Sequence, residues 1–199
     1  MGSVTLKPPF DAGTTFSAMY GAIEVPHNTP VPSIGYVGTS IAMVSTAGSG
    51  YRETGVGAFL NRFPTSSSGY YLITVLADVW FRGEYWAFFT GYGKTTTALR
   101  LQAVLQGKRS RSNRVHNDLD IFSFEGPVGF SFPALEWRPR QVSIIVKPSR
   151  LDSVFILANA IQSVIAIGGG MNIVSNLGIL VKQIEVTGIA QGVLPAPWF

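Results

Sequence analysis

Hydrophobic residues occupy every second position through residues 70–82 of this 199-residue chain. The series begins with Tyr71, Ile73 and Val75 and continues to Phe81. Because successive side chains of a β-strand point to opposite faces, this period of two predicts a strand with one buried face. Residues 64–69, a run of Pro, Thr, Ser and Gly, precede the strand and are typical of a turn.

Short apolar segments rich in Val, Ile, Phe and Tyr predict further strands at residues 98–105, 120–124, 142–147 and 177–186. Gly83 and Glu84 offer a short turn, so we expect residues 85–89 to pair with the first strand as a hairpin. Residues 154–167 fit either a helix or two strands. We favour two strands, because β-branched residues dominate the segment and residues 168–170, three glycines, begin another turn.

Twenty-two glycines and twelve prolines punctuate these segments, and pairs of opposite charges four residues apart are rare. The pattern therefore predicts an all-β fold with about eight to ten short strands. A chain of this length commonly forms one domain when it is all-β, so we expect a single jelly-roll β-sandwich over residues 1–199. Prolines near both ends predict extended arms at about residues 1–12 and 190–199.

Composition excludes several classes of protein. Charged residues make up 13% and hydrophobic residues 46%, which is typical of a chain that folds rather than one that stays disordered. No run of apolar residues approaches the roughly 18 needed for a membrane span, so no membrane partner is expected. The start of the chain does not resemble a secretory signal, and the absence of cysteine excludes disulfides and thiolate sites.

The excess positive charge is local. The net charge is +4, and Lys108, Arg109, Arg111 and Arg114 lie within seven positions that contain no acidic residue. The rest of the chain is neutral, so we do not expect the broad basic surface of a nucleic-acid-binding protein. Guanidinium groups bind carboxylates, sulfates and phosphates, which makes this loop a candidate ligand site; the alternative is a solvated hairpin tip.

Two other places carry candidate ligand-binding residues. Tyr51, Arg52 and Glu53 follow a Gly-Ser-Gly turn and could form a patch on which a sugar stacks. His116 stands close to Asp118 and Asp120, where it could act as a general base or be a turn residue bonded to its neighbours. The predicted ligand-binding residues are therefore Lys108, Arg109, Arg111, Arg114, His116, Tyr51 and Arg52.

Residues that could support catalysis are scarce. The two histidines, His27 and His116, do not have the spacing of a metal site, and Asn117, Asp118 and Asp120 lack the pattern of a calcium loop. No Gly-x-Ser-x-Gly elbow is present, and residues 91–96 lack the spacing of a phosphate-binding loop. We therefore predict a protein without catalytic activity, bound metal or cofactor.

Residues 59–75 read Phe-Leu-Asn-Arg-Phe-Pro-Thr-Ser-Ser-Ser-Gly-Tyr-Tyr-Leu-Ile-Thr-Val. This segment resembles the central signature of tumour-necrosis-factor-like jelly rolls, which include complement-type globular heads and bacterial spore-surface heads. Residues 16–18 and 177–184 resemble other parts of the same heads. The chain departs from them at residues 100–140, which are longer, and no collagen-like repeat precedes the segment. The resemblance implies a compact homotrimer.

An excess of aromatic residues also favours an oligomer. If Tyr71, Ile73 and Val75 face the interior of a sandwich, the neighbouring aromatics cannot all be buried there as well. We therefore assign a subunit interface to Tyr70, Trp80, Tyr85 and Phe89.

The leading hypothesis is a trimeric recognition or surface-assembly head that binds a glycan or a protein. It would act outside the cell, on a bacterial, spore or virion surface or at a phage fibre tip. One alternative is a small viral capsid protein, although Lys7 is the only basic residue in the first fifty and a basic packaging arm is therefore missing. Another is a membrane-active toxin that presents Trp80, Trp86 and Trp198 to lipid.

Overall fold

The computed structural model describes residues 1–24, 28–88, 92–106, 112–127, 133–149 and 153–192. These residues form nine strands, all joined in one antiparallel sheet. The strands are β1 (Ser3–Leu6), β2 (Ala12–Glu24), β3 (Asn28–Val31), β4 (Tyr36–Leu60), β5 (Tyr71–Phe88), β6 (Tyr92–Gln106), β7 (Ser112–Pro127), β8 (Ala134–Val146) and β9 (Ser153–Gly188). Within these ranges no helix is long and apolar enough to cross a membrane.

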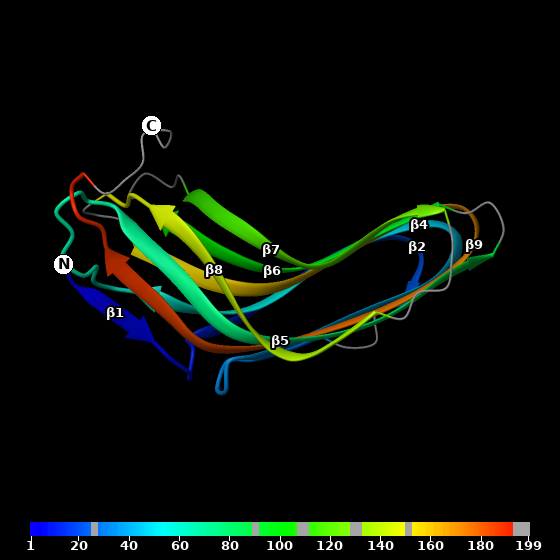
Figure 1. Ribbon diagram of the computed structural model, residues 1–199, viewed down its shortest axis with the longest axis horizontal. Coiled ribbons are helices and arrows are strands. Elements are labelled where there is room, and N and C mark those ends of the chain that lie inside the picture. The colour runs from blue at the N-terminus through cyan, green and yellow to red at the C-terminus, as the bar shows by residue number, and fades with distance from the viewer. Residues whose placement is uncertain (25–27, 89–91, 107–111, 128–132, 150–152, 193–199) are drawn as a thin grey trace.

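The sheet folds back on itself to make a sandwich of two layers (Figure 1). We call one the β6 layer; it consists of β2, residues 47–60 of β4, residues 153–167 of β9, β6 and β7. The other, the β5 layer, consists of β3, residues 36–45 of β4, residues 171–188 of β9, β5 and β8, with β1 beside the end of β9. β4 and β9 therefore run through both layers.

Glycine-rich segments form the bend between the layers. Ser45 pairs with Met171 and Ala47 with Ile167, so β9 uses three residues, 168–170, where β4 uses one. The strand on the outside of a bend must cover a longer path, and Gly168 does so with a φ of 66°, which favours glycine. Residues 154–167 are β-structure rather than helix, as we favoured, but they form one continuous part of β9 and not two strands. The predicted break after them is wrong, because the three glycines bend the strand rather than end it.

The core lies between the two layers. Ile73, Val75 and Phe81 of β5 are at most 2% exposed and belong to the same hydrophobic cluster as Leu99 and Leu101 of β6. Their alternation along each strand is the period of two that the sequence shows. The all-β jelly-roll sandwich of about eight to ten strands is confirmed, with nine strands in the described residues.

Two predictions about β5 are wrong. The strand continues through Gly83 and Glu84 to Phe88, in register with β9, so there is no hairpin at these residues. Tyr85 therefore stays in phase with Phe81 and lies in the core, where it is 2% exposed. Its ring stacks on the rings of Phe122 and Phe124 of the opposite layer, at centroid distances of 5.2 and 6.1 Å. Tyr85 cannot contact another subunit from there.

The predicted arms are only partly described. In the N-terminal segment, residues 3–6 form β1 and pair with residues 184–187 of β9, so this part of the arm belongs to the sheet. In the C-terminal segment, residues 193–199 lie outside the described residues. The remaining predicted strands, at residues 98–105, 120–124, 142–147 and 177–186, lie within β6, β7, β8 and β9, apart from residue 147, which follows the end of β8.

Candidate functional site

A hollow of about 360 Å³ opens on the outer face of the β6 layer. Side chains from β2, β4, β6, β7 and β9 line it, and we call it the outer groove. Its lining residues are Thr14, Thr15, Phe16, Tyr51, Glu53, Gln102, Val104, Arg114, Leu157 and Asn159. The residues that alternate with them, such as Val56, Leu101 and Ala158, face the core.

Glycines in β4 shape the floor of the outer groove. A Cβ atom at Gly55 would lie 1.7 Å from Oδ1 of Asn159, and one at Gly57 would lie 2.7 Å from Cδ2 of Leu157. The side chains from β9 therefore lie directly over the β4 backbone, where any larger residue would displace them. Because of this close approach, the outer groove has a low floor between β2 and β6, and Asn159 lies beside the charged side chain of Glu53.

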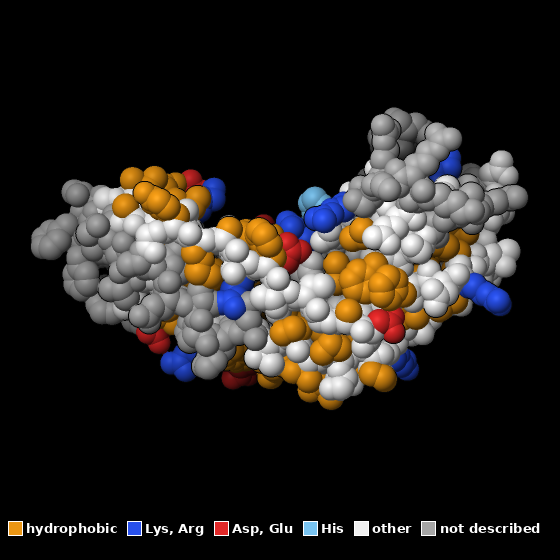
Figure 2. Space-filling model, turned by 180° about the vertical axis from the view of Figure 1, so that it is seen from behind, with side chains coloured by type: hydrophobic (Ala, Val, Ile, Leu, Met, Phe, Trp, Pro, Cys, Tyr) orange, Lys and Arg blue, Asp and Glu red, His pale blue; other side chains and the backbone are white. Residues whose placement is uncertain are grey.

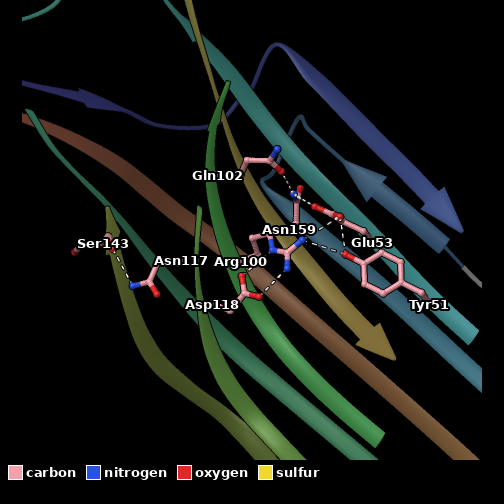
Figure 3. A network of polar contacts seen from close by, with 8 residues as sticks. All are labelled: Tyr51, Glu53, Arg100, Gln102, Asn117, Asp118, Ser143 and Asn159. Atoms are coloured by element: carbon pink, nitrogen blue, oxygen red, sulfur yellow. Dashed lines mark hydrogen bonds and ion pairs between the residues drawn. The ribbon is translucent and has the colours of Figure 1, made fainter. Parts of the chain in front are cut away.

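A charged network adjoins the groove through two of its lining residues, Tyr51 and Glu53 (Figure 3). Arg100 of β6 makes two hydrogen bonds of 2.7 Å to the carboxylate of Asp118, from Nε to Oδ1 and from Nη2 to Oδ2. Its Nη1 donates to the hydroxyl of Tyr51 at 3.1 Å and lies 3.5 Å from Oε2 of Glu53. The Tyr51 hydroxyl in turn donates to Glu53 at 2.8 Å. Arg100 is thus held by a bidentate contact with Asp118 and in turn contacts two groove residues, Tyr51 and Glu53.

The protonation states in this network follow from its geometry. The hydrogen bond to Asp118 raises the pKa of the Arg100 guanidinium, so Arg100 is a permanent cation. Burial, followed by the hydrogen bond to Glu53, raises the pKa of Tyr51 to about 12, and its hydroxyl is therefore a neutral donor at neutral pH. The Arg100 and Glu53 side chains are 20% and 18% exposed, so water screens this pair less than an ion pair on an open surface.

Two amides extend the network across the groove. Asn159 is 1% exposed, and its Nδ2 donates to Oε1 of Glu53 and, at 3.5 Å, to Oε1 of Gln102. Its Oδ1 atom is buried and has no hydrogen-bond partner within the described part of the chain. A buried acceptor without a donor costs about 1–3 kcal/mol.

An exposed aromatic ring lies beside these polar groups. Phe16 of β2 is 58% exposed, so burial in the core does not explain why a hydrophobic residue occupies this position. Its ring centroid is 6.0 Å from that of Tyr51, with the two planes tilted by 60°. The outer groove thus combines an apolar wall with a dense set of hydrogen-bonding groups.

The structure brings together some of the predicted ligand-binding residues. Tyr51 and Arg114 both line the outer groove. Arg52 does not, because it points to the opposite face of β4, is only 8% exposed, and has Nε and Nη1 atoms without a partner among the residues described. Burial lowers the pKa of its guanidinium. The predicted patch of Tyr51 with Arg52 is therefore wrong, since successive strand residues face opposite ways.

The remaining predicted ligand residues lie elsewhere. His116 of β7 is exposed, pairs in register with Gln102, and lines a second hollow of about 390 Å³ between the layers with Leu72 and Ser143. In that hollow Asn117 donates from Nδ2 to the Ser143 carbonyl at 3.0 Å. Lys108, Arg109 and Arg111 lie outside the described residues.

The predicted interface residues are also dispersed. Tyr85 is in the core, and Phe89 lies outside the described residues. Tyr70 is half-buried, and the ammonium of Lys147 lies 4.7 Å from its ring centroid. Trp80 is half-buried on the outer face of the β5 layer.

Sequence reasoning missed Phe16, Arg100, Gln102 and Asn159. Arg100 and Gln102 left a detectable signal, because they alternate with core residues along a strand that was predicted. Nothing local, however, indicates that β4, β6 and β9 are neighbours. In the described residues no group of three or more histidines and carboxylates could hold a metal ion.

No family model matches this chain, and no curated protein matches it. Among solved structures, the chain is similar to the enzymatically active domain of bacteriophage CBA120 tailspike protein 4, with 10% identity and a TM-score of 0.27. The match covers 82% of this chain and 19% of that domain, so the chain spans about a fifth of its length. It is also similar to TmCBM61, a carbohydrate-binding module solved with β-1,4-galactotriose, with 11% identity, 90% coverage of both chains and a TM-score of 0.26. Similarities at this level assign neither family nor function.

Proposed function

We propose that this protein is a non-catalytic recognition head that binds a glycan in the outer groove and acts at an extracellular, spore or virion surface. One observation carries the proposal: an exposed ring, Phe16, lies beside a connected network of buried and half-buried hydrogen-bonding groups. A sugar ring has an apolar C–H face and a rim of hydroxyl groups, and it needs both kinds of partner.

The groups of the network match the two roles of a hydroxyl group. The carboxylate of Glu53 and the side-chain oxygen of Gln102 accept hydrogen bonds, and Arg114 donates them. Oδ1 of Asn159 is buried against the backbone at Gly55, so Glu53 and Gln102 are the acceptors that a ligand hydroxyl would contact. Because the network is already hydrogen-bonded, little side-chain entropy is lost on binding.

The arrangement of charges favours binding over hydrolysis. Glycosidases use two carboxyl groups, one of which donates a proton to the departing oxygen. Here the guanidinium of Arg100 lies between Glu53 and Asp118 and contacts both of them. Carboxylates held by a shared cation are suited to positioning a polar ligand rather than to transferring a proton.

We also propose that the head is a homotrimer of the tumour-necrosis-factor-like type, as the resemblance of residues 59–75 implies. The surface that supports the trimer differs from the interface that we predicted from the sequence. Large exposed side chains gather on the outer face of the β6 layer near the bend: Tyr20 (78% exposed), Ile167 (62%), Ile165 (42%) and Tyr92 (36%). Tyr20 and Ile165 share the same neighbour, Ser49, and Ile167 pairs with Tyr92. Exposed apolar groups this close together are typical of a protein contact.

A glycan array tests the ligand, with Glu53→Gln as the informative variant and Glu125→Gln as its matched control. Glu125 has the same type of partners as Glu53, a tyrosine hydroxyl and a cation, but lies away from the groove. We expect the native protein to bind at least one glycan, Glu53→Gln to bind it at least tenfold more weakly, and Glu125→Gln to bind it normally. Absence of any binding, or equal losses in both variants, would contradict the proposal.

Light scattering on the same samples tests the assembly separately. We expect three times the 21.4 kDa mass of the chain. A monomeric mass would exclude the trimer and leave the glycan proposal standing.

A further inference from the structure

Three aromatic side chains converge at Gly178 on the outer face of the β5 layer. They are Tyr36 of β4, Trp80 of β5 and Trp137 of β8, and we call them the aromatic cluster. A Cβ atom at Gly178 would lie 3.4 Å from Cη2 of Trp137, 3.4 Å from Cε3 of Trp80 and 3.6 Å from the hydroxyl oxygen of Tyr36. All three rings therefore approach one point of the sheet from different strands.

Glycines let these rings lie low on the sheet. Gly38, Gly178 and Trp80 form one row across β4, β9 and β5. A Cβ atom at Gly38 would come within 2.9 Å of the Tyr36 hydroxyl, so the Tyr36 ring reaches over this glycine as well. Two neighbouring positions without side chains thus form the floor beneath the aromatic cluster.

The cluster is open to a ligand. Trp137 is 48% exposed, and Trp80 and Tyr36 are half-buried. Leaving indole surface in water is unfavourable, at roughly 25 cal/mol per Å² of apolar area. None of these residues lines the outer groove, which is formed by the other layer. Figure 2 shows that hydrophobic side chains form separate patches among polar atoms on the face in view, rather than one continuous apolar surface.

Charges around the cluster select the kind of ligand. Asp78 and Arg82 flank Trp80 on the same face of β5, whereas Arg138, next to Trp137 in β8, pairs with Val79 and therefore faces the other side of the sheet. Trp80 thus has one acidic and one basic neighbour on the face of the cluster. Asp78 is 2.6 Å from the ammonium of Lys182, so no net negative charge is left to attract a cation into an aromatic cage. A subunit interface would have to bury these charges, and interface centres are depleted in them.

We propose that the aromatic cluster is a second carbohydrate site, which takes an uncharged sugar ring on the faces of Trp80 and Trp137 with its hydroxyl groups toward Asp78 and Arg82. This inference rests on the proposed function for the class of ligand, but not for the site. The two sites lie on opposite outer faces of one sandwich, so a single chain would bridge two glycan strands.

Tryptophan fluorescence distinguishes the two sites, because none of the described residues that line the outer groove is a tryptophan. Native protein is titrated with cellohexaose, maltohexaose, mannohexaose and every glycan bound on the array. We expect an indole signal that saturates with at least one of them. We expect Trp137→Ala to weaken this binding at least tenfold and Trp137→Tyr, which keeps a stacking ring, to restore most of it. Phe59→Ala removes an aromatic ring of similar exposure (49%) that lies outside both sites, so it is the matched control and should leave the titration unchanged.

Several results would overturn the inference. These are the absence of an indole signal with every probe, a signal that persists in Trp137→Ala, or a drop in oligomeric mass in that variant, which would make the cluster a contact with a second copy. If Glu53→Gln abolishes array binding while Trp137→Ala leaves it intact, the inference fails and the proposed function stands. If Trp137→Ala alone abolishes binding, the outer groove is not the glycan site and the aromatic cluster is.

Discussion

Replacing Gly55 by alanine should disrupt the outer groove through one residue, Asn159. The added Cβ atom would lie 1.7 Å from Oδ1 of Asn159 and 2.9 Å from the carbonyl oxygen of Ala158. The first distance is far inside van der Waals contact, so the Asn159 side chain must leave its position. The second is shorter than the contacts that Cβ atoms make in proteins and involves a backbone atom, so β4 and β9 must also shift relative to each other.

The magnitude follows from the hydrogen bonds of Asn159. Its amide donates to the carboxylate of Glu53 and to Gln102. A hydrogen bond to a charged group contributes about 1.5–3 kcal/mol, and a long one between neutral groups contributes less than about 1 kcal/mol. Gly55 does not have a positive φ, so alanine recovers about 0.4–1 kcal/mol through the unfolded chain. We therefore expect Gly55→Ala to lower the free energy of unfolding by about 2 kcal/mol.

Urea denaturation of four proteins measures this: the native chain, Gly55→Ala, Asn159→Ala and the double variant. Because Asn159→Ala removes the obstructing amide, Gly55→Ala should cost about 1–2 kcal/mol less in that background than in the native one. Costs that add to within about 0.5 kcal/mol would refute the reasoning, since independent sites behave in that way. Glycan binding should be lost in both single variants, because both displace the amide.

Two further perturbations test other parts of the structure. The pKa of Tyr51 is raised from 10 to about 12, so the folded state keeps the phenol proton that the unfolded chain loses. The stability that this proton provides is complete below pH 10 and is lost as the pH rises through 12. After allowance for solvent screening it is about 1 kcal/mol. Between pH 9 and pH 11.5 the free energy of unfolding in urea should therefore fall less for Tyr51→Phe than for the native protein. An equal fall would disprove the assignment. Tyr85→Leu should lower the unfolding free energy by about 1–3 kcal/mol and leave the oligomeric mass unchanged, because the variant loses the stacking of the Tyr85 ring on Phe122 and Phe124. A lower mass at unchanged stability would place Tyr85 at an interface after all.

Local patterns were enough to predict the fold class. Ile73, Val75 and Phe81 alternate with a face that carries Thr74, Asp78 and Arg82, because the other face of β5 is buried, and this information lies within a dozen residues. The same holds for Leu99 and Leu101 in β6. The lengths of the strands could not be predicted from local patterns. β4 and β9 bend from one layer into the other, and the sequence of a bend within a strand resembles that of a turn between strands.

The outer groove depends on pairing between distant segments. Glu53 and Asn159 are 106 residues apart and become neighbours only because β4 pairs with β9 along almost its whole length. Arg100 joins them because β6 pairs with the other side of β9. The outward polar positions of each strand could be recognised from the alternation. The partner that each one meets is set by strand order, which no local pattern specifies.

Glycines explain both the wrong prediction of a hairpin at Gly83 and the shape of the two proposed sites. Gly83 was interpreted as a turn, yet its backbone is extended, and a Cβ atom there would lie 2.4 Å from the ring of Tyr85. Gly55 and Gly178 serve the same purpose on the outer faces, where they admit the side chain of Asn159 and the aromatic cluster. In a long strand of a sandwich, a glycine beside polar or aromatic residues therefore indicates a close approach of a neighbouring side chain as readily as a turn. On an inner face that side chain fills the core, whereas on an outer face it forms a recess that a ligand can enter.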